Sequence, residues 1–269
     1  MSLKGIRFFA SGLERDPALL KCLHQLNGHF VLFNYFQLHS SKWLEYLEEY
    51  DMYAIIDSGA FSMYQRKQKS NKQPYQQMNL LPNDEMEQLT LEGYAAFINQ
   101  HKHNKRILGF FPLDVIGEPL KTKENYLKLK QLTNGKIYPV WQVTDSLESL
   151  EELIKEEYEM IGVGGIVPFL AKRQDKVEKI LKRLFSTFPD VNFHFLGGAN
   201  ELLVKYNWFS SDSTAFLNAR KSTKQRKVYL ENGYRVKAPE HMSTEEIIKN
   251  NLQFLLSLEC YKPLQLSLI

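Results

Sequence analysis

The chain has 269 residues, of which 43% are hydrophobic and 24% charged, and this composition is typical of a soluble globular protein. The formal net charge of +3 at pH 7 is too small to identify a partner by itself. No apolar run approaches the roughly 18 residues needed to span a bilayer, and the N-terminus lacks the residue order of a signal peptide, so we expect a cytoplasmic protein with no membrane partner.

Only two cysteines are present, Cys22 and Cys260, and each falls in a stretch with a helical pattern. So few cysteines, so far apart, argue against a disulfide framework and against a cysteine-rich zinc site. We therefore expect two core thiols, no metal ion and no other cofactor.

Runs of β-branched or aromatic residues alternate along the chain with stretches of helical periodicity. In chain order, strands are expected at residues 6–12, 29–35, 52–59, 107–114, 137–143, 160–166, 191–198 and 208–212. Helices are expected between them at residues 16–26, 41–49, 84–100, 121–132, 146–158, 174–186 and 200–206, and a last helix at 243–258.

This alternation predicts parallel strands joined by right-handed helical crossovers. Eight strand–helix units in about 250 residues match the usual size of a TIM-type (β/α)8 barrel. We therefore expect an α/β protein in which residues 1–269 form a single barrel domain. An open doubly wound sheet is the alternative, because periodicity does not show whether a sheet closes.

One connection is longer than a barrel needs. Residues 62–83, "SMYQRKQKSNKQPYQQMNLLPN", are polar and basic and follow the third expected strand directly. An ordinary connection from a strand to a helix is about 2–6 residues long. We expect this insertion to lie at the functional face of the barrel.

Three expected strands end on an aspartate: Asp57 in "MYAIIDSGAF", Asp114 in "ILGFFPLDVIG" and Asp212 in "NWFSSDSTAF". The carboxyl ends of barrel strands meet at one mouth, where active sites of this fold are built. The three carboxylates are therefore expected to line one pocket. An aspartate after a strand can instead cap the next helix, and "DSTAFLNAR" would suit Asp212 as such a cap.

Other strand ends add polar or small residues to the same mouth. Gln142 ends the fifth strand, the pair Gly164–Gly165 ends the sixth and the pair Gly197–Gly198 ends the seventh. Gln142 could bind a ligand or only the backbone. Each glycine pair could form a tight turn or a phosphate-binding loop.

Six short motifs together resemble the tRNA-guanine transglycosylases and their DNA-modifying 7-deazaguanine relatives. They are "DSGAF" (57–61), "LDVIG" (113–117), "VWQV" (140–143), "GVGGI" (162–166), "FLGG" (195–198) and "DSTAFLNAR" (212–220). They occur in the order found in that family, whose fold is a modified (β/α)8 barrel.

The resemblance implies exchange of guanine in a nucleic acid for a free 7-deazaguanine base. Asp212 would be the nucleophile that attacks the sugar C1′, and Asp57 the acid–base residue. Asp114 would read the edge of the base. The other base-binding residues implied by the resemblance are Ser58, Phe61, Gln142, Gly164, Gly165, Leu196 and Gly197.

The chain departs from the tRNA enzymes, which carry a zinc site of three cysteines and a histidine after the nucleophile strand. The basic run "NARKSTKQRKVYLENGYRVK" (218–237) stands there instead, and it is either a solvated surface or a patch for nucleic-acid phosphates. The lost zinc favours DNA over tRNA as substrate, as in the zinc-free phage and mobile-element members. The cations expected to contact the polymer are Arg66, Lys67, Lys69, Arg220, Lys221, Lys224, Arg226 and Lys227.

Two other functions stay open. A phosphate-binding barrel lyase or isomerase would use the glycine pairs for phosphate, and would need a catalytic lysine or paired glutamates at strand ends, which the sequence does not offer. A non-catalytic barrel that binds a base or a nucleic acid would be expected to have lost one of the aspartates. A homo-oligomer or a partner protein is compatible with each of these functions.

Overall fold

The computed structural model describes residues 5–38, 42–59 and 90–260, with the backbone alone for residues 169–172 and 260. The insertion predicted at 62–83 lies outside these ranges, as do Phe61, Arg66, Lys67 and Lys69.

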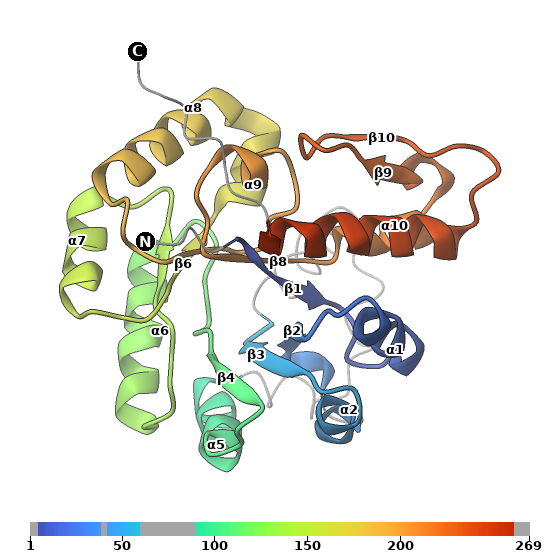
Figure 1. Ribbon diagram of the computed structural model, residues 1–269. Helices are drawn as coiled ribbons and strands as arrows, with labels where there is room; N and C mark the ends of the chain where they lie inside the picture. Colours follow the sequence, from blue (N-terminus) through green and yellow to red (C-terminus); the bar gives the residue numbers. More distant parts are fainter. Residues whose placement is uncertain (1–4, 39–41, 60–89, 261–269) are drawn as a thin grey trace, which may run out of the picture.

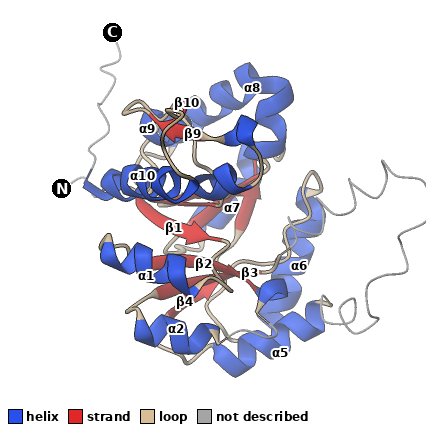
Figure 2. Cartoon of the chain, turned by 90° about the vertical axis from the view of Figure 1, so that its right-hand side faces the viewer, coloured by secondary structure: helices blue, strands red, loops and turns tan. Residues whose placement is uncertain are grey.

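Parallel strands form one curled sheet in the middle of the molecule, and the helices lie on its outside (Figure 1, Figure 2). The strands are β1 (Arg7–Ser11), β2 (Phe30–Asn34), β3 (Tyr53–Asp57), β4 (Ile107–Phe110), β5 (Val140–Gln142), β6 (Ile161–Gly164), β7 (Phe193–Phe195) and β8 (Ser210–Ser213). Their order in the eight-stranded sheet is β4-β3-β2-β1-β8-β7-β6-β5.

Consecutive strands are neighbours throughout this order, and β8 pairs with β1. The two ends of the sheet, β4 and β5, meet through a parallel bridge between Phe110 and Ile137. An open doubly wound sheet would instead reverse direction partway through its strand order. The predicted fold class is confirmed: this is a single-domain TIM-type (β/α)8 fold.

The helices follow the strands in the expected alternation. They are α1 (Pro17–Gln25), α2 (Trp43–Glu49), α5 (Leu91–His101), α6 (Pro119–Leu132), α7 (Leu147–Lys155), α8 (Ile166–Thr187), α9 (Leu202–Lys205) and α10 (Thr244–Ser257). Asp16 caps α1 by accepting a hydrogen bond from the Leu19 N–H, and Ser243 forms a capping box with Glu246 at the start of α10. Within the described ranges, no helix is long and apolar enough to cross a membrane.

Helix α8 begins eight residues before the predicted position of 174. Gly165 has a φ of +77°, and this left-handed turn sends the chain from β6 directly into the helix. The helical geometry is interrupted at Arg173, whose φ is −150°. The sequence pattern therefore identified the part of α8 after the kink and missed the part before it.

The barrel interior has an apolar layer below a polar layer. Side chains alternate along a strand, so in β1 Phe9 and Ser11 point inward while Phe8 and Ala10 face the helices. Phe9 belongs to an interior cluster with Leu32, Ile55 and Val140. Two residues further along the same strands are the polar side chains of Ser11, Asn34, Asp57 and Gln142.

A small hairpin lies outside the barrel, next to α10 (Figure 1). It consists of β9 (Lys227–Tyr229) and β10 (Arg235–Lys237), both inside the basic run, and the sequence analysis did not predict it. Asn232–Gly233, a strong hairpin signal, forms the turn, and Gly233 has a φ of +81°. Asn251 of α10 holds β9 by accepting from the Tyr229 N–H and donating to the Lys227 carbonyl.

Tyr94 ties α5 to the barrel. Its ring is fully buried, and its hydroxyl lies 3.1 Å from the Ile56 carbonyl of β3 and 2.9 Å from the Phe111 carbonyl beyond β4. This hydroxyl therefore sits at the two strand ends that carry Asp57 and lead to Asp114.

Replacing Tyr94 by phenylalanine should lower the free energy of unfolding by about 1–3 kcal/mol, because the buried Phe111 carbonyl loses the hydroxyl donor while the Ile56 carbonyl keeps the Phe111 N–H. Urea unfolding monitored by circular dichroism measures this change. Tyr234→Phe is the matched control, since Tyr234 is 54% exposed. Equal stability of the two variants would show that the Tyr94 hydroxyl does not hold the strands.

Candidate active site

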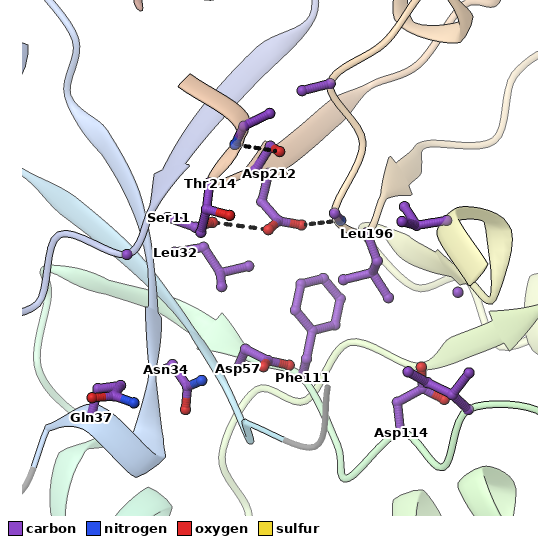
Figure 3. A pocket seen from close by; sticks show the side chains of 18 of the residues that line it. Ser11, Leu32, Asn34, Gln37, Asp57, Phe111, Asp114, Leu196, Asp212 and Thr214 are labelled. Carbon is purple, nitrogen blue, oxygen red and sulfur yellow. Dashed lines mark hydrogen bonds between the residues drawn. The ribbon is translucent and has the colours of Figure 1, made fainter. Parts of the chain in front are cut away.

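A cavity of about 780 Å³ opens at the carboxyl ends of the strands. Its lining includes the three predicted aspartates: Asp57 at the end of β3, Asp114 beyond β4, and Asp212 in β8. Figure 3 shows these side chains arranged around the ring of Phe111. The closed barrel brings them together, because all its strands end at the same mouth.

Helix capping does not explain Asp114 or Asp212. The N-cap residue of α6 is Glu118, and that of the short helix η2 (Ala215–Arg220) is Thr214. Asp57 accepts a 2.9 Å hydrogen bond from the Gly59 N–H, which ties the carboxyl group to its own loop.

Asp57 accepts hydrogen bonds from main-chain N–H groups of its own loop. Burial, with the nearby charges of Asp212 and Asp114, raises its pKa from 3.8 to about 7, against the opposing effect of the hydrogen bonds from Gly59 and Ser58. A carboxyl group that titrates near neutrality can both give and take a proton at physiological pH.

Asp212 is held at both carboxylate oxygens. Ser11 Oγ donates to Oδ2 at 2.9 Å and the Gly197 N–H donates to Oδ1 at 2.8 Å (Figure 3). The carboxylate therefore has a fixed orientation toward the cavity, and these donors offset part of the cost of burying its charge.

His194 supports Asp212 from inside the barrel. It is fully buried, with Nδ1 2.8 Å from Ser210 Oγ and Nε2 3.3 Å from Asp212 Oδ1. A carboxylate only accepts hydrogen bonds, so Nε2 carries the hydrogen that points at Asp212. The rings of Phe9 and Phe111 pack against the imidazole at centroid distances of 5.9 and 5.1 Å and fix its plane.

Asp114 is held at one oxygen and faces the sixth strand with the other. Oδ1 accepts from Thr122 Oγ1 at 2.9 Å and from Gln142 Nε2 at 2.6 Å. Burial raises the pKa of Asp114 in spite of these two hydrogen bonds. Oδ2 would lie 3.0 Å from a Cβ at position 164, so Gly164 permits this close approach.

Gln142 lies behind the cavity wall and is 1% exposed. Its Nε2 donates to Asp114 and to the Val115 carbonyl, and its Oε1 accepts from the Gly117 N–H at 2.8 Å. The amide therefore positions the loop that carries Asp114. Ser58 is also behind the wall, where its hydroxyl donates to the Pro112 carbonyl at 3.1 Å.

The two glycine pairs have different tasks. Gly164 and Gly165 line the cavity and lead into α8. The Gly197 N–H is used by Asp212, and Gly198 is pressed against the Phe195 ring, where a Cβ would come within 2.2 Å. The second pair is thus part of the support of Asp212. Leu196, which directly precedes Gly197, lines the cavity.

The structure divides the basic residues after β8. Lys221 lines the cavity. Arg220 forms a 2.7 Å ion pair with Asp16, and Arg226 donates to Thr244 Oγ1 and to the Met242 carbonyl. Lys224 and Lys227 are exposed and lie outside the cavity lining.

Three residues that the sequence analysis missed hold the aspartates: Ser11, Thr122 and His194. Ser11 is an inward-facing strand end like those of Asp57 and Asp212. His194 is the polar centre of an otherwise aromatic strand, "FHF", and this was a usable signal. No sequence signal pointed to Thr122, since it lies among charged residues of α6.

Metal ligation finds no support in the described part of the chain, where no group of three or more histidine, cysteine or acidic side chains is arranged to hold an ion. Nor does a lysine occupy the carboxyl end of any of the eight described barrel strands.

No protein-family model and no curated protein matches the chain. Solved structures that resemble it include a 4-hydroxy-2-oxoglutarate/2-dehydro-3-deoxyphosphogluconate aldolase, with 12% identity, a TM-score of 0.48 and 95% of each chain covered. A mutant tryptophan synthase α-subunit from Pyrococcus furiosus has 9% identity and a TM-score of 0.49, with 95% of this chain and 99% of that one covered. Tryptophan synthase from M. tuberculosis has 7% identity and a TM-score of 0.46, with 94% of each chain covered.

These comparisons correct the expected family. The similar structures named above are an aldolase and tryptophan synthases rather than tRNA-guanine transglycosylases, and no family model supports the six motifs. The prediction of a guanine-exchanging transglycosylase is therefore wrong, and the 7-deazaguanine substrate falls with it. The motifs are short and sit at strand ends, where the barrel itself favours glycines and polar residues.

The raised pKa of Asp57 makes stability depend on pH. The protonated carboxyl group favours the folded chain, so its contribution is complete below about pH 4 and is lost as the pH rises through about 7. Between pH 5 and 8, wild type should lose about 1–3 kcal/mol of unfolding free energy relative to Asp57→Asn, since this half-buried group is partly screened by solvent.

Urea unfolding of both proteins across this pH range tests the effect. Asp190→Asn removes an exposed carboxylate and should show no such pH-dependent difference from wild type. A constant difference between wild type and Asp57→Asn would mean that Asp57 titrates normally.

Proposed function

We propose that this protein is an enzyme of the lyase or isomerase type that transfers protons on a small substrate bound in the barrel mouth. Asp57 is the general acid–base residue. The observation that carries the proposal is the pKa of Asp57, about 7, in a cavity that also holds Asp114 and Asp212.

The catalytic step needs only Asp57 and the substrate. In its carboxylate form Asp57 takes a proton from a substrate O–H or from a C–H next to a carbonyl group. When the proton comes from an O–H, the oxygen electron pair forms a carbonyl group while the carbon–carbon bond breaks, and the other fragment becomes an enolate. When it comes from a C–H, the electron pair left on carbon forms an enolate directly. Asp57, now protonated, returns the proton to a different atom of the substrate and regains its carboxylate form.

Asp212 differs from Asp57 in that both its oxygens already accept hydrogen bonds from the chain. We assign it a fixed role: it accepts a hydrogen bond from a substrate hydroxyl and stabilises positive charge that develops nearby. The second oxygen of Asp114, beside Gly164, is assigned to another donor group of the substrate.

An imine mechanism is not part of this proposal, because the described barrel strands do not end in a lysine. A non-catalytic binding protein is disfavoured by the cost of burying three carboxyl groups at one mouth. The cytoplasmic location and a homo-oligomer or partner protein stay predictions, as does nucleic-acid binding.

Proton exchange with solvent tests the proposal without a known product. A panel of small hydroxycarbonyl compounds is incubated with the protein in D2O, and loss of C–H signals is followed by proton NMR. Wild type should exchange at least one compound, at a rate that rises with pH through about 7, since only the carboxylate form takes a proton. Asp57→Asn should slow this exchange about 10²- to 10⁴-fold.

Asp190→Asn is again the matched control and should exchange at the wild-type rate. If a compound binds and its exchange is equally fast in Asp57→Asn, Asp57 is not the acid–base residue. If no compound that binds is exchanged by wild type, the proposed reaction class is wrong.

A further inference from the structure

Three cations line the cavity, and two of them, Lys221 and Arg235, come from the part of the chain after β8. The third, Arg15, follows β1 and donates to the Gln37 carbonyl. Lys221 follows η2, and Arg235 is the first residue of β10 in the hairpin. Both follow β8, the strand of Asp212, along the chain. Lys221 is exposed and Arg235 is half-buried.

Neither cation has an acidic partner among the residues that the structure describes. The guanidinium group of Arg235 lies 5.6 Å from the centroid of the Tyr229 ring, a cation–π contact that fixes the side chain and leaves its N–H groups available. The other arginines of the run donate to the chain, Arg220 to Asp16 and Arg226 to Thr244. Near Arg235, Lys237 pairs with Glu240 at 2.9 Å.

The charges of the cavity are unevenly distributed. Asp57, Asp114 and Asp212 form the floor, at the strand ends, while the acidic residues Glu14 and Asp16 follow β1 and are engaged by the Asn34 N–H and by Arg220. Lys221 and Arg235, on the rim, have no acidic partner among the described residues. Asn218, a neutral side chain that can donate, lines the cavity on the rim side. A ligand that fits this arrangement has an anionic end at the rim and a hydroxyl or carbonyl end at the floor.

We infer that Lys221 and Arg235 form a binding subsite for a phosphate monoester group, so that the substrate is a small phosphorylated compound. A dianion with several acceptor oxygens matches one lysine, one arginine and a neutral amide better than a single carboxylate does. In naming the substrate this inference rests on the proposed function, but phosphate binding itself does not require Asp57.

The same residues argue for a small ligand over a nucleic acid. Of the five cations at 220–227, only Lys221 lines the cavity, while Arg220 and Arg226 are engaged by the protein. Of these five cations, only Lys224 and Lys227 remain for contacts with a nucleic acid outside the cavity. Two cations are few for a polyanion, whose binding depends on many phosphate contacts.

Calorimetric titration with inorganic phosphate and with glycerol 3-phosphate tests the subsite. Lys221→Ala and Arg235→Ala should each raise the Kd of both probes about tenfold. Lys224→Ala is the matched control, a lysine of the same run outside the cavity, and should bind like wild type. Arg235→Lys keeps the charge and should recover part of the affinity, and thermal unfolding confirms that each variant is folded.

Asp57→Asn separates this inference from the proposed reaction, since it should leave phosphate affinity unchanged while it abolishes proton exchange. The subsite is refuted if wild type shows no saturable binding of either probe, or if Lys221→Ala and Lys224→Ala weaken binding equally. A single-stranded oligonucleotide that binds more tightly than glycerol 3-phosphate, and loses affinity equally in all three alanine variants, would also overturn it in favour of a nucleic-acid surface.

Discussion

Burial of three carboxyl groups at one barrel mouth is the constraint on which the site depends. An ionised carboxylate out of water is tolerated only where donors surround it. Asp212 has such donors in Ser11 and Gly197, and Asp114 has them in Thr122 and Gln142. Asp57 accepts from main-chain N–H groups of its own loop, and burial together with the charges of the other two aspartates raises its pKa to about 7. The three carboxyl groups therefore differ in the kind of donor that holds them and in how far each is fixed.

The barrel strands supply this arrangement through their alternation. Phe9 and Ser11 of β1 point inward one above the other, and the register pairs Phe9 with Asp212. In the same way Leu32 and Asn34 lie beside Ile55 and Asp57. The apolar layer closes the barrel from below, and the polar layer above it faces the cavity. A shift of one residue in any of these strands would exchange the two faces and remove the site.

The sequence was sufficient to predict the strands, their alternation with helices and the convergence of the three aspartates. This is because the carboxyl ends of all strands of a barrel lie at the same mouth. The sequence was insufficient for the partners of those aspartates. Gln142 was expected to contact the ligand, but it lies behind the cavity wall. His194 was not predicted as a site residue, because the register of β7 against β8, which places it beside Asp212, cannot be read from the sequence. The family inferred from six short motifs was wrong, because barrels of unrelated activity place glycines and carboxylates at the same strand ends. The residues after β8 contain both a basic run and the hairpin signal Asn232–Gly233. The sequence analysis interpreted only the basic run and did not predict the hairpin.

The network around Asp114 also crosses the least paired boundary of the barrel. Strands β2 and β3 are in register over 30–34 and 53–57, whereas β4 and β5 share only the bridge of Phe110 with Ile137. The Gln142 side chain, from β5, spans this boundary to reach Asp114 and the 115–117 loop beyond β4. Side-chain hydrogen bonds of the site therefore hold β5 to the loop after β4, where the main chain offers few hydrogen bonds. Opening of the barrel along this boundary would separate Asp114, which follows β4 and stays next to Asp57 through the pairing of β4 with β3, from Gln142 of β5 and Gly164 of β6. The cavity therefore has one wall that can yield, between β4 and β5, and one that is rigid, from β4 through β3, β2 and β1 to β8.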